Sequence, residues 1–157
     1  MVDRYSLCIL SDTYFERFKY PAMMQNKYES RLYFLALRQT NGIVWLIPLS
    51  SQVDKYRRAI HAEESKRGKG KCIYQYICRI KGNDSVMLIG DAIPVTDSYI
   101  LRPFTVNGKA FVVQDKIDIN AIKTRFSKYL ALVRQGKLKP AIDILAIEKE
   151  LLKDLGK

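Results

Sequence analysis

The stretch that decides the fold runs from Lys27 to Arg58 and reads KYESRLYFLALRQTNGIVWLIPLSSQVDKYRR. It predicts a hairpin of two strands, 31–39 and 43–49, because both runs are apolar and Asn41-Gly42 is typical of a tight hairpin turn. The return run is apolar almost throughout, which favours a central strand. Pro48 is expected to end the strand pairing, since proline has no backbone N–H to donate.

Two serines, Ser50 and Ser51, stand between the second strand and a helical pattern. Ser51 and Asp54 fit a capping box, with Ser51 as the N-cap. Such a junction exposes hydroxyls and free backbone N–H groups at the positive end of a helix, which suits a phosphate. A plain turn and cap is the structural alternative. The functional interpretation is favoured by Lys55, one turn into the helix, and by Arg31 at the start of the first strand.

The 157 residues fit one domain, 1–157, large enough for a hydrophobic core. Lysine and arginine number 27 against 16 acidic residues, and the net charge of +11 indicates an anionic partner, usually nucleic acid. No apolar run is long enough to span a bilayer and no signal peptide is recognisable, so we expect a cytoplasmic protein without membrane contact. The cysteines have no CxxC spacing, which favours buried reduced thiols over a zinc site.

Strand patterns dominate the first two thirds of the chain, and helical periodicity begins at Asp118. Gly136 is expected to end that helix and Pro140 to begin another. This order predicts an α+β domain on a curved antiparallel sheet. The run KRGKGK at 66–71 predicts a mobile basic loop, which is either a solvated tip or a contact to a phosphate backbone.

The sequence has no P-loop, no Rossmann fingerprint, no G-x-S-x-G and no metal-ligand cluster. The single histidine, His61, is more typical of a surface residue than of a catalyst. What remains is a basic site with hydroxyls, and RNA cleavage can proceed on such a set without metal or cofactor because the nucleophile is the substrate's own 2′-OH. Lysine and arginine would neutralise charge on the phosphate, and a lysine in a basic cluster can exchange protons.

The motif WLIPLSS at 45–51, between a strand hairpin and KYRR, resembles the ToxN/AbiQ-like toxins of type III toxin–antitoxin systems. The similarity is greatest to the CptN and TenpN group. The opening YSLCILSDTYFERF at 5–18 and the run VMLIGDAIPV at 86–95 also resemble these toxins, so the resemblance follows most of the chain in order.

This resemblance implies a metal-independent endoribonuclease that leaves a 2′,3′-cyclic phosphate and a 5′-hydroxyl. The implied fold is a compact, strongly curved antiparallel sheet or partial barrel with flanking helices, similar to MazF/Kid-type toxins. The implied inhibitor is a short repeat RNA, folded as a pseudoknot, which the toxin cuts from its own precursor. The substrate would be cellular RNA. The assembly would be an RNA-bridged toxin–RNA oligomer, and the biological role would be phage defence. No cofactor is implied.

The family's Ser/Thr–Ser pair matches Ser50 and Ser51, and its basic residue at the start of the hairpin matches Arg31. A family tyrosine in the preceding loop corresponds approximately to Tyr28. The family's lysine lies very close behind the serine, whereas the first lysine here is Lys55, one helical turn on. We therefore predict that the catalytic residues are Ser51, Lys55, Ser50 and Arg31. The predicted RNA-binding residues are Lys27, Tyr28, Arg57, Arg58, Lys66, Arg67, Lys69 and Lys71.

Two other functions stay open from the sequence. The first is a non-catalytic RNA-binding module, in which the same basic surface only holds phosphates. The second is a MazF-like mRNA interferase that is neutralised by a protein antitoxin. Tandem short repeats upstream of the coding sequence would favour the type III system, and a small upstream open reading frame would favour the MazF-like alternative.

Overall fold

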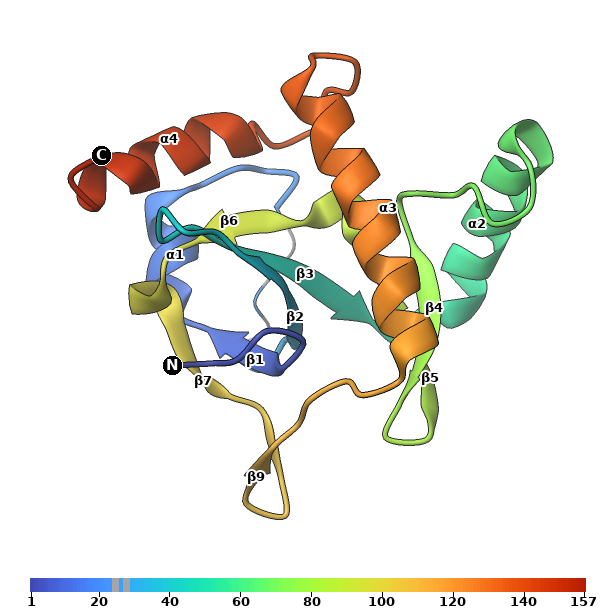
Figure 1. Ribbon diagram of the computed structural model, residues 1–157, viewed down its shortest axis with the longest axis horizontal. Helices are drawn as coiled ribbons and strands as arrows, with labels where there is room; N and C mark the ends of the chain where they lie inside the picture. Colours follow the sequence, from blue (N-terminus) through green and yellow to red (C-terminus); the bar gives the residue numbers. More distant parts are fainter. Residues whose placement is uncertain (24–25, 27–28) are drawn as a thin grey trace.

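An antiparallel sheet with helices around it forms the part of the chain described by the computed structural model, residues 1–23, 26 and 29–157 (Figure 1). The strands of the main sheet are β1 (Leu7–Leu10), β2 (Tyr33–Arg38), β3 (Val44–Ser50), β4 (Tyr76–Ile80), β5 (Asn83–Met87), β6 (Ile93–Val95) and β7 (Ile100–Pro103). A small hairpin consists of β8 (Thr105–Val106) and β9 (Lys109–Ala110). The helices are α1 (Asp12–Arg17), α2 (Val53–Arg67), α3 (Lys116–Arg134) and α4 (Ile144–Asp154), with short 3-10 turns η1 (Ile89–Asp91) and η2 (Asp97–Tyr99).

The predicted hairpin is confirmed as the pair β2–β3. Its register runs from Tyr33 opposite Pro48 to Arg38 opposite Val44. In the turn, the Gln39 N–H donates to the Ile43 carbonyl at 2.8 Å, and Gly42 has a φ of +95°. Glycine reaches this conformation without a steric cost, which explains the Asn-Gly signal.

The prediction that Pro48 ends the strand pairing is wrong. β3 continues to Ser50, and its last two residues pair with β5, Leu49 opposite Met87 and Ser50 opposite Val86. Proline lacks only the backbone N–H donor. The Pro48 carbonyl can still accept, and it accepts a hydrogen bond from the Leu88 N–H at 2.9 Å. The pairing therefore survives because the neighbouring segment supplies the N–H at this point.

β3 is the central strand, as predicted. One of its edges pairs with β2, and the other edge pairs with two strands, β5 and β6. The order of the sheet is β4-β5-β3-β2-β1-β7, with β6 pairing separately along the first half of β3. β5 pairs with the end of β3, so the connection from β5 to β6 passes alongside the strand through η1. In the described residues β4 and β7 are left at the two edges, and the pairing does not close into a barrel.

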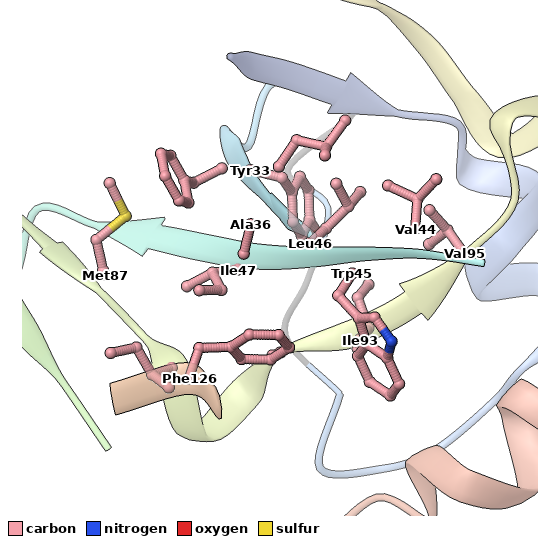
Figure 2. Packing of buried hydrophobic residues seen from close by; sticks show 14 of the residues in the cluster. Tyr33, Ala36, Val44, Trp45, Leu46, Ile47, Met87, Ile93, Val95 and Phe126 are labelled. Atoms are coloured by element: carbon pink, nitrogen blue, oxygen red, sulfur yellow. The ribbon is translucent and has the colours of Figure 1, made fainter. Parts of the chain in front are cut away.

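The core is built on β3, whose residues from Val44 to Leu49 are buried (Figure 2). The Trp45 ring contacts Phe126 of α3, with the ring centroids 5.9 Å apart. Helix α3 lies across the sheet in Figure 1 and buries the face that its helical periodicity predicts. The buried residues of α3 are Ile122, Phe126, Tyr129, Leu130 and Val133. An α+β fold with an antiparallel sheet and flanking helices is therefore confirmed.

The helix boundaries correct two details of the sequence prediction. α3 begins two residues before Asp118, and Asp115 caps it by accepting hydrogen bonds from two backbone N–H groups. Gly136, with φ +73°, follows the end of α3 as predicted. Pro140 does not begin the last helix. Helix α4 begins at Ile144 because the carboxylate of Asp143 accepts from a first-turn N–H and supplies the cap.

The three cysteines, Cys8, Cys72 and Cys78, are buried and free, as predicted. Burial raises the pKa of the Cys78 thiol to about 12, so the thiol stays protonated at neutral pH. Within the described residues no group of three or more His, Cys, Asp or Glu side chains could hold a metal ion. None of the described helices has both the length and the apolar character needed to cross a bilayer.

Candidate active site

The junction between β3 and α2 is a tight turn that carries both predicted serines. Ser50 is the last residue of β3, and its Oγ accepts a hydrogen bond from the Gln52 N–H at 3.1 Å. The Ser51 carbonyl accepts from the Val53 N–H at 2.8 Å, and the Ser51 side chain is exposed. The hydroxyl of Ser51 therefore faces solvent at the start of a helix.

The predicted capping box of Ser51 and Asp54 is not formed. The N-cap position of α2 belongs to Gln52, and no side-chain hydrogen bond caps the helix. In the turn, the Ser50 Oγ and the Ser51 carbonyl accept hydrogen bonds from the Gln52 and Val53 N–H groups instead. The N–H groups of the first helical turn beyond them have no partner within the helix. This end of α2 keeps the character of an anion site, and the Ser51 hydroxyl is not used for capping.

Arg31 lies beneath the serine turn and is only 7% exposed. It precedes β2 rather than opening it, and its Nη1 donates to the Leu49 carbonyl at 2.7 Å. This bond holds a guanidinium against the end of β3, one residue before Ser50. A buried cation at this position strengthens the positive potential of the turn, because little solvent screens it.

Lys55 completes the predicted catalytic set from the other side of the turn. It is exposed in the first turn of α2, and its Nζ lies 5.0 Å from the centre of the Tyr56 ring. Lys55 and Arg31 also interact electrostatically with one carboxylate, that of Asp91 in η1. Burial raises the pKa of Asp91, and the two cations lower it to a smaller extent.

Sequence reasoning did not single out Asp91, the carboxylate whose pKa Arg31 and Lys55 lower. The residue lies in the run VMLIGDAIPV, which the sequence analysis used only as an apolar strand similar to a family motif. The available signal was a single carboxylate inside an otherwise apolar run. Such a charge costs free energy when it is buried unless a partner compensates it.

Helix α2 carries half of the predicted RNA-binding residues and has no buried side chain. In Figure 1 it lies on the outer side of β4, at the edge of the molecule. Arg57 Nη2 is 3.4 Å from Asp84 Oδ2 of β5, and Arg67 Nε is 2.7 Å from Glu63 Oε1. Both are exposed pairs of the kind that contributes little to stability. Arg58, Lys66, Lys69 and Lys71 are exposed as well. Lys27 and Tyr28 lie outside the described residues.

The predicted basic loop at 66–71 is shorter than expected, because Lys66 and Arg67 belong to the last turn of α2. The remaining loop, 68–71, is connected to the rest of the fold through Arg125 of α3. The Arg125 Nη2 donates to the Gly70 carbonyl at 3.2 Å, and its Nε donates to the Cys72 carbonyl at 3.1 Å. Glu64 of α2 accepts a hydrogen bond from the Gly70 N–H. The loop is therefore bound to two helices, while its lysine side chains stay exposed.

A surface hollow of about 320 Å³ lies between α2 and β4. Its lining includes Arg57 and His61 from α2, Tyr76 from β4 and Arg125 from α3. The Arg125 guanidinium lies over the Tyr76 ring, 4.9 Å from its centre. Cations beside an aromatic ring suit both the backbone and the bases of a single-stranded nucleic acid. Arg125 and Tyr76 were not in the predicted RNA-binding set.

Comparisons with known proteins give structural matches but no match by sequence. No protein-family model matches the chain, and no curated protein matches it. The fold matches the solved structure of AbiQ, a lactococcal anti-phage endoribonuclease of a type III toxin–antitoxin system, with a TM-score of 0.70. That match covers 99% of this chain and 100% of AbiQ at 17% sequence identity. The chain has the AbiQ fold.

A second match to the same fold comes from work on a bacterial antiviral system that a processed non-coding RNA regulates. It has a TM-score of 0.63 and 15% identity, and it covers 97% of this chain and 99% of that chain. The predicted resemblance to the ToxN/AbiQ-like toxins is confirmed at the level of the fold. Assignment to the CptN and TenpN group stays a prediction.

Proposed function

We propose that this protein is the toxin of a type III toxin–antitoxin system, a metal-independent and sequence-preferring endoribonuclease that is inhibited by RNA. The observation that carries the proposal is the AbiQ fold, which extends over 99% of this chain and all of AbiQ. Residues 1–157 would act as one domain in the cytoplasm. The partial-barrel curvature, the similarity to MazF/Kid-type toxins and the CptN/TenpN assignment belong to the same proposal.

The serine turn would bind the scissile phosphate. The Ser51 hydroxyl and the first N–H groups of α2 would contact its oxygens, because both are exposed and lie at the positive end of the helix dipole. Ser50 would support the turn through its hydrogen bond to the Gln52 N–H. Arg31 would add positive charge from beneath without reaching far into solvent.

In the proposed reaction the 2′-OH of the substrate attacks the neighbouring phosphorus. The O2′–P bond forms, the P–O5′ bond breaks, and a proton must leave O2′ while another reaches O5′. Lys55 is the proposed proton donor to O5′, since its ammonium group is exposed beside the turn. The products would be a 2′,3′-cyclic phosphate and a 5′-hydroxyl.

RNA would follow α2 away from the serine turn. The net charge of +11 supports binding to a polyanion, and the exposed arginine and lysine side chains of α2 provide phosphate contacts. The hollow beside β4 adds Arg125 and the Tyr76 ring to this path. The proposed inhibitor is a short repeat RNA with a pseudoknot, which the toxin cuts from its precursor and with which it forms an RNA-bridged oligomer.

Neutralisation in cells tests this function. We expect induced synthesis of the protein to arrest bacterial growth, and co-transcription of the native DNA directly upstream of its coding sequence to restore growth. The rescue should persist when every possible start codon in that DNA is mutated, because the antitoxin is RNA. Rescue that disappears with the start codons would support a protein antitoxin instead. The absence of any growth defect would favour the RNA-binding module.

A further inference from the structure

Two flat side chains, Arg125 and Tyr76, stack on each other in the lining of the hollow between α2 and β4. The guanidinium of Arg125 lies 4.9 Å from the centre of the Tyr76 ring, and both side chains are half-buried. Aromatic rings and guanidinium planes are the surfaces on which proteins stack unpaired bases. The hollow measures about 320 Å³, near the lower end of the range of small-ligand sites, about 300–1,000 Å³. It therefore suits one small planar group.

Hydrogen bonds hold both members of this stack in place. The Tyr76 hydroxyl donates to Asp118 Oδ1 of α3 at 2.7 Å. The guanidinium of Arg125 donates to three backbone carbonyls, at 3.1 Å to Cys72 and at 3.2 Å to Gly70 and Ala121. These bonds use three of its five N–H groups and fix the plane of the guanidinium. A stacking surface that is already ordered loses little conformational entropy when a ligand binds to it.

The hollow also has polar groups that can contact the edge of a base. The Cys72 thiol donates to Gln75 Oε1 at 3.5 Å, which turns the other end of the Gln75 carboxamide, its N–H₂ group, away from the thiol. Among the described residues, neither this N–H₂ group nor the His61 ring has a hydrogen-bond partner. An amide and an imidazole can pair with the donors and acceptors on a base edge. Stacking and edge contacts are therefore both available in one hollow.

Helix α2 connects the hollow to the serine turn (Figure 1). From Val53 to His61 the helix rises about 12 Å, so the hollow lies apart from the serine turn on the same element. Arg57 lines the hollow and is exposed, and its ion pair with Asp84, at 3.4 Å, is of the weak surface kind. A phosphate of the RNA can therefore bind Arg57 while the adjoining base enters the hollow.

We propose that this hollow binds one unpaired nucleobase of the RNA, from a nucleotide that flanks the cleaved one. The base stacks on the Arg125–Tyr76 pair, and the Gln75 amide and the His61 ring contact its edge. The assignment rests on the proposed function for its RNA partner. It also accounts for a preference for sequence, because contacts between cations and phosphates position an RNA without reading its bases.

Replacement of Tyr76 with leucine removes the stacking surface and keeps an apolar side chain. The probe is a short single-stranded RNA, selected for binding to the wild-type protein from a pool of 2′-fluoro RNA, which has no 2′-OH to attack and is not cut. We expect Tyr76→Leu to bind this probe about 5–150-fold more weakly, the range for the loss of one stacked base. The salt dependence of binding should not change, because no charge is removed. A flatter salt dependence, or wild-type affinity, would overturn the assignment.

Probes that each lack one base identify the nucleotide in the hollow. One abasic position should weaken binding to the wild type by a similar factor and should have little effect on Tyr76→Leu, in which the contact is already lost. The matched control is Tyr99→Leu. Tyr99 is another half-buried tyrosine, its hydroxyl accepts from Arg17 at 2.8 Å, and it precedes β7 at the opposite edge of the sheet. The control should bind every probe as the wild type does. Full additivity in Tyr76→Leu, or the same coupling in Tyr99→Leu, would contradict the base site.

Photo-crosslinking of the wild-type protein tests the same contact and does not depend on how well Tyr76→Leu folds. A photoreactive 4-thiouridine or 6-thioguanosine at the sensitive position should crosslink to a residue that lines the hollow, as identified by mass spectrometry. Crosslinks only to other segments would overturn the assignment.

These binding measurements need no cleavage, so the two proposals can fail separately. A wild-type protein that shows the coupled abasic position and cuts no RNA contradicts the proposed endoribonuclease and supports the base site. A wild-type protein that cuts RNA, with no abasic position coupled to Tyr76, contradicts only the base site.

Discussion

Replacement of Ser51 with alanine is expected to abolish RNA cleavage in a protein that remains folded. The hydroxyl is exposed and caps no helix, so its loss should change the free energy of unfolding by no more than about 0.5 kcal/mol. If it contacts the scissile phosphate, the cleavage rate should fall by about 10²–10³-fold, as for the loss of one donor to a developing charge. Thermal unfolding and single-turnover cleavage measure the two effects on one sample.

Ser65→Ala is the matched control for this substitution. Ser65 lies on the same helix, and its Oγ donates to the His61 carbonyl at 2.8 Å, away from the serine turn. The control should retain both cleavage and toxicity. A Ser51→Ala protein that is stable, binds RNA and still arrests growth would remove this serine from the active site.

Replacement of Arg31 with alanine is expected to reduce stability and cleavage together. The change leaves the buried Leu49 carbonyl without its Arg31 donor, which costs about 1–3 kcal/mol. It also removes the cation beneath the serine turn, so cleavage of the folded fraction should fall by about 10²-fold or more. Chemical denaturation gives the free energy of unfolding, and cleavage is measured well below the denaturation midpoint.

Two variants distinguish the charge of Arg31 from its general contribution to the fold. Arg31→Lys keeps a cation at this position, and it should preserve measurable cleavage despite a poorer hydrogen bond to Leu49. Arg38→Ala removes an arginine from the same hairpin, where it pairs with Asp97 at 2.7 Å. This control should cost about 1 kcal/mol or less and leave cleavage unchanged. Equal cleavage by Arg31→Ala and Arg38→Ala would contradict a catalytic role for Arg31.

The hairpin of β2 and β3 was predictable because its determinants are local. Asn41-Gly42 specifies the turn, and the apolar runs on either side specify the strands. The end of β3 was not predictable in the same way. Whether Pro48 interrupts a ladder depends on which segment lies opposite, and Leu88, forty residues later, supplies the N–H. Ser51 was likewise assigned to a cap from spacing alone, while the real turn uses Ser50 and a backbone carbonyl.

The candidate site shows the same division between local and tertiary information. The serines and Lys55 are close in sequence, so their proximity follows from the chain. Arg31 and Lys55 influence the pKa of Asp91 only because η1 packs against β3 and α3, and no local pattern reports that packing. Arg125 is similar, since its position over Tyr76 depends on how α3 crosses the sheet.

Cleavage of RNA in the presence of EDTA, with identification of the product ends, tests the central claim most directly. The substrate pair is an RNA that contains a mapped cleavage site and the same RNA with a 2′-deoxy nucleotide on the 5′ side of the cut. We predict undiminished cleavage of the first RNA in EDTA, with 2′,3′-cyclic phosphate and 5′-hydroxyl ends, and no cleavage of the second. A requirement for a divalent ion, 5′-phosphate ends, or cleavage of the 2′-deoxy substrate would contradict the proposed reaction.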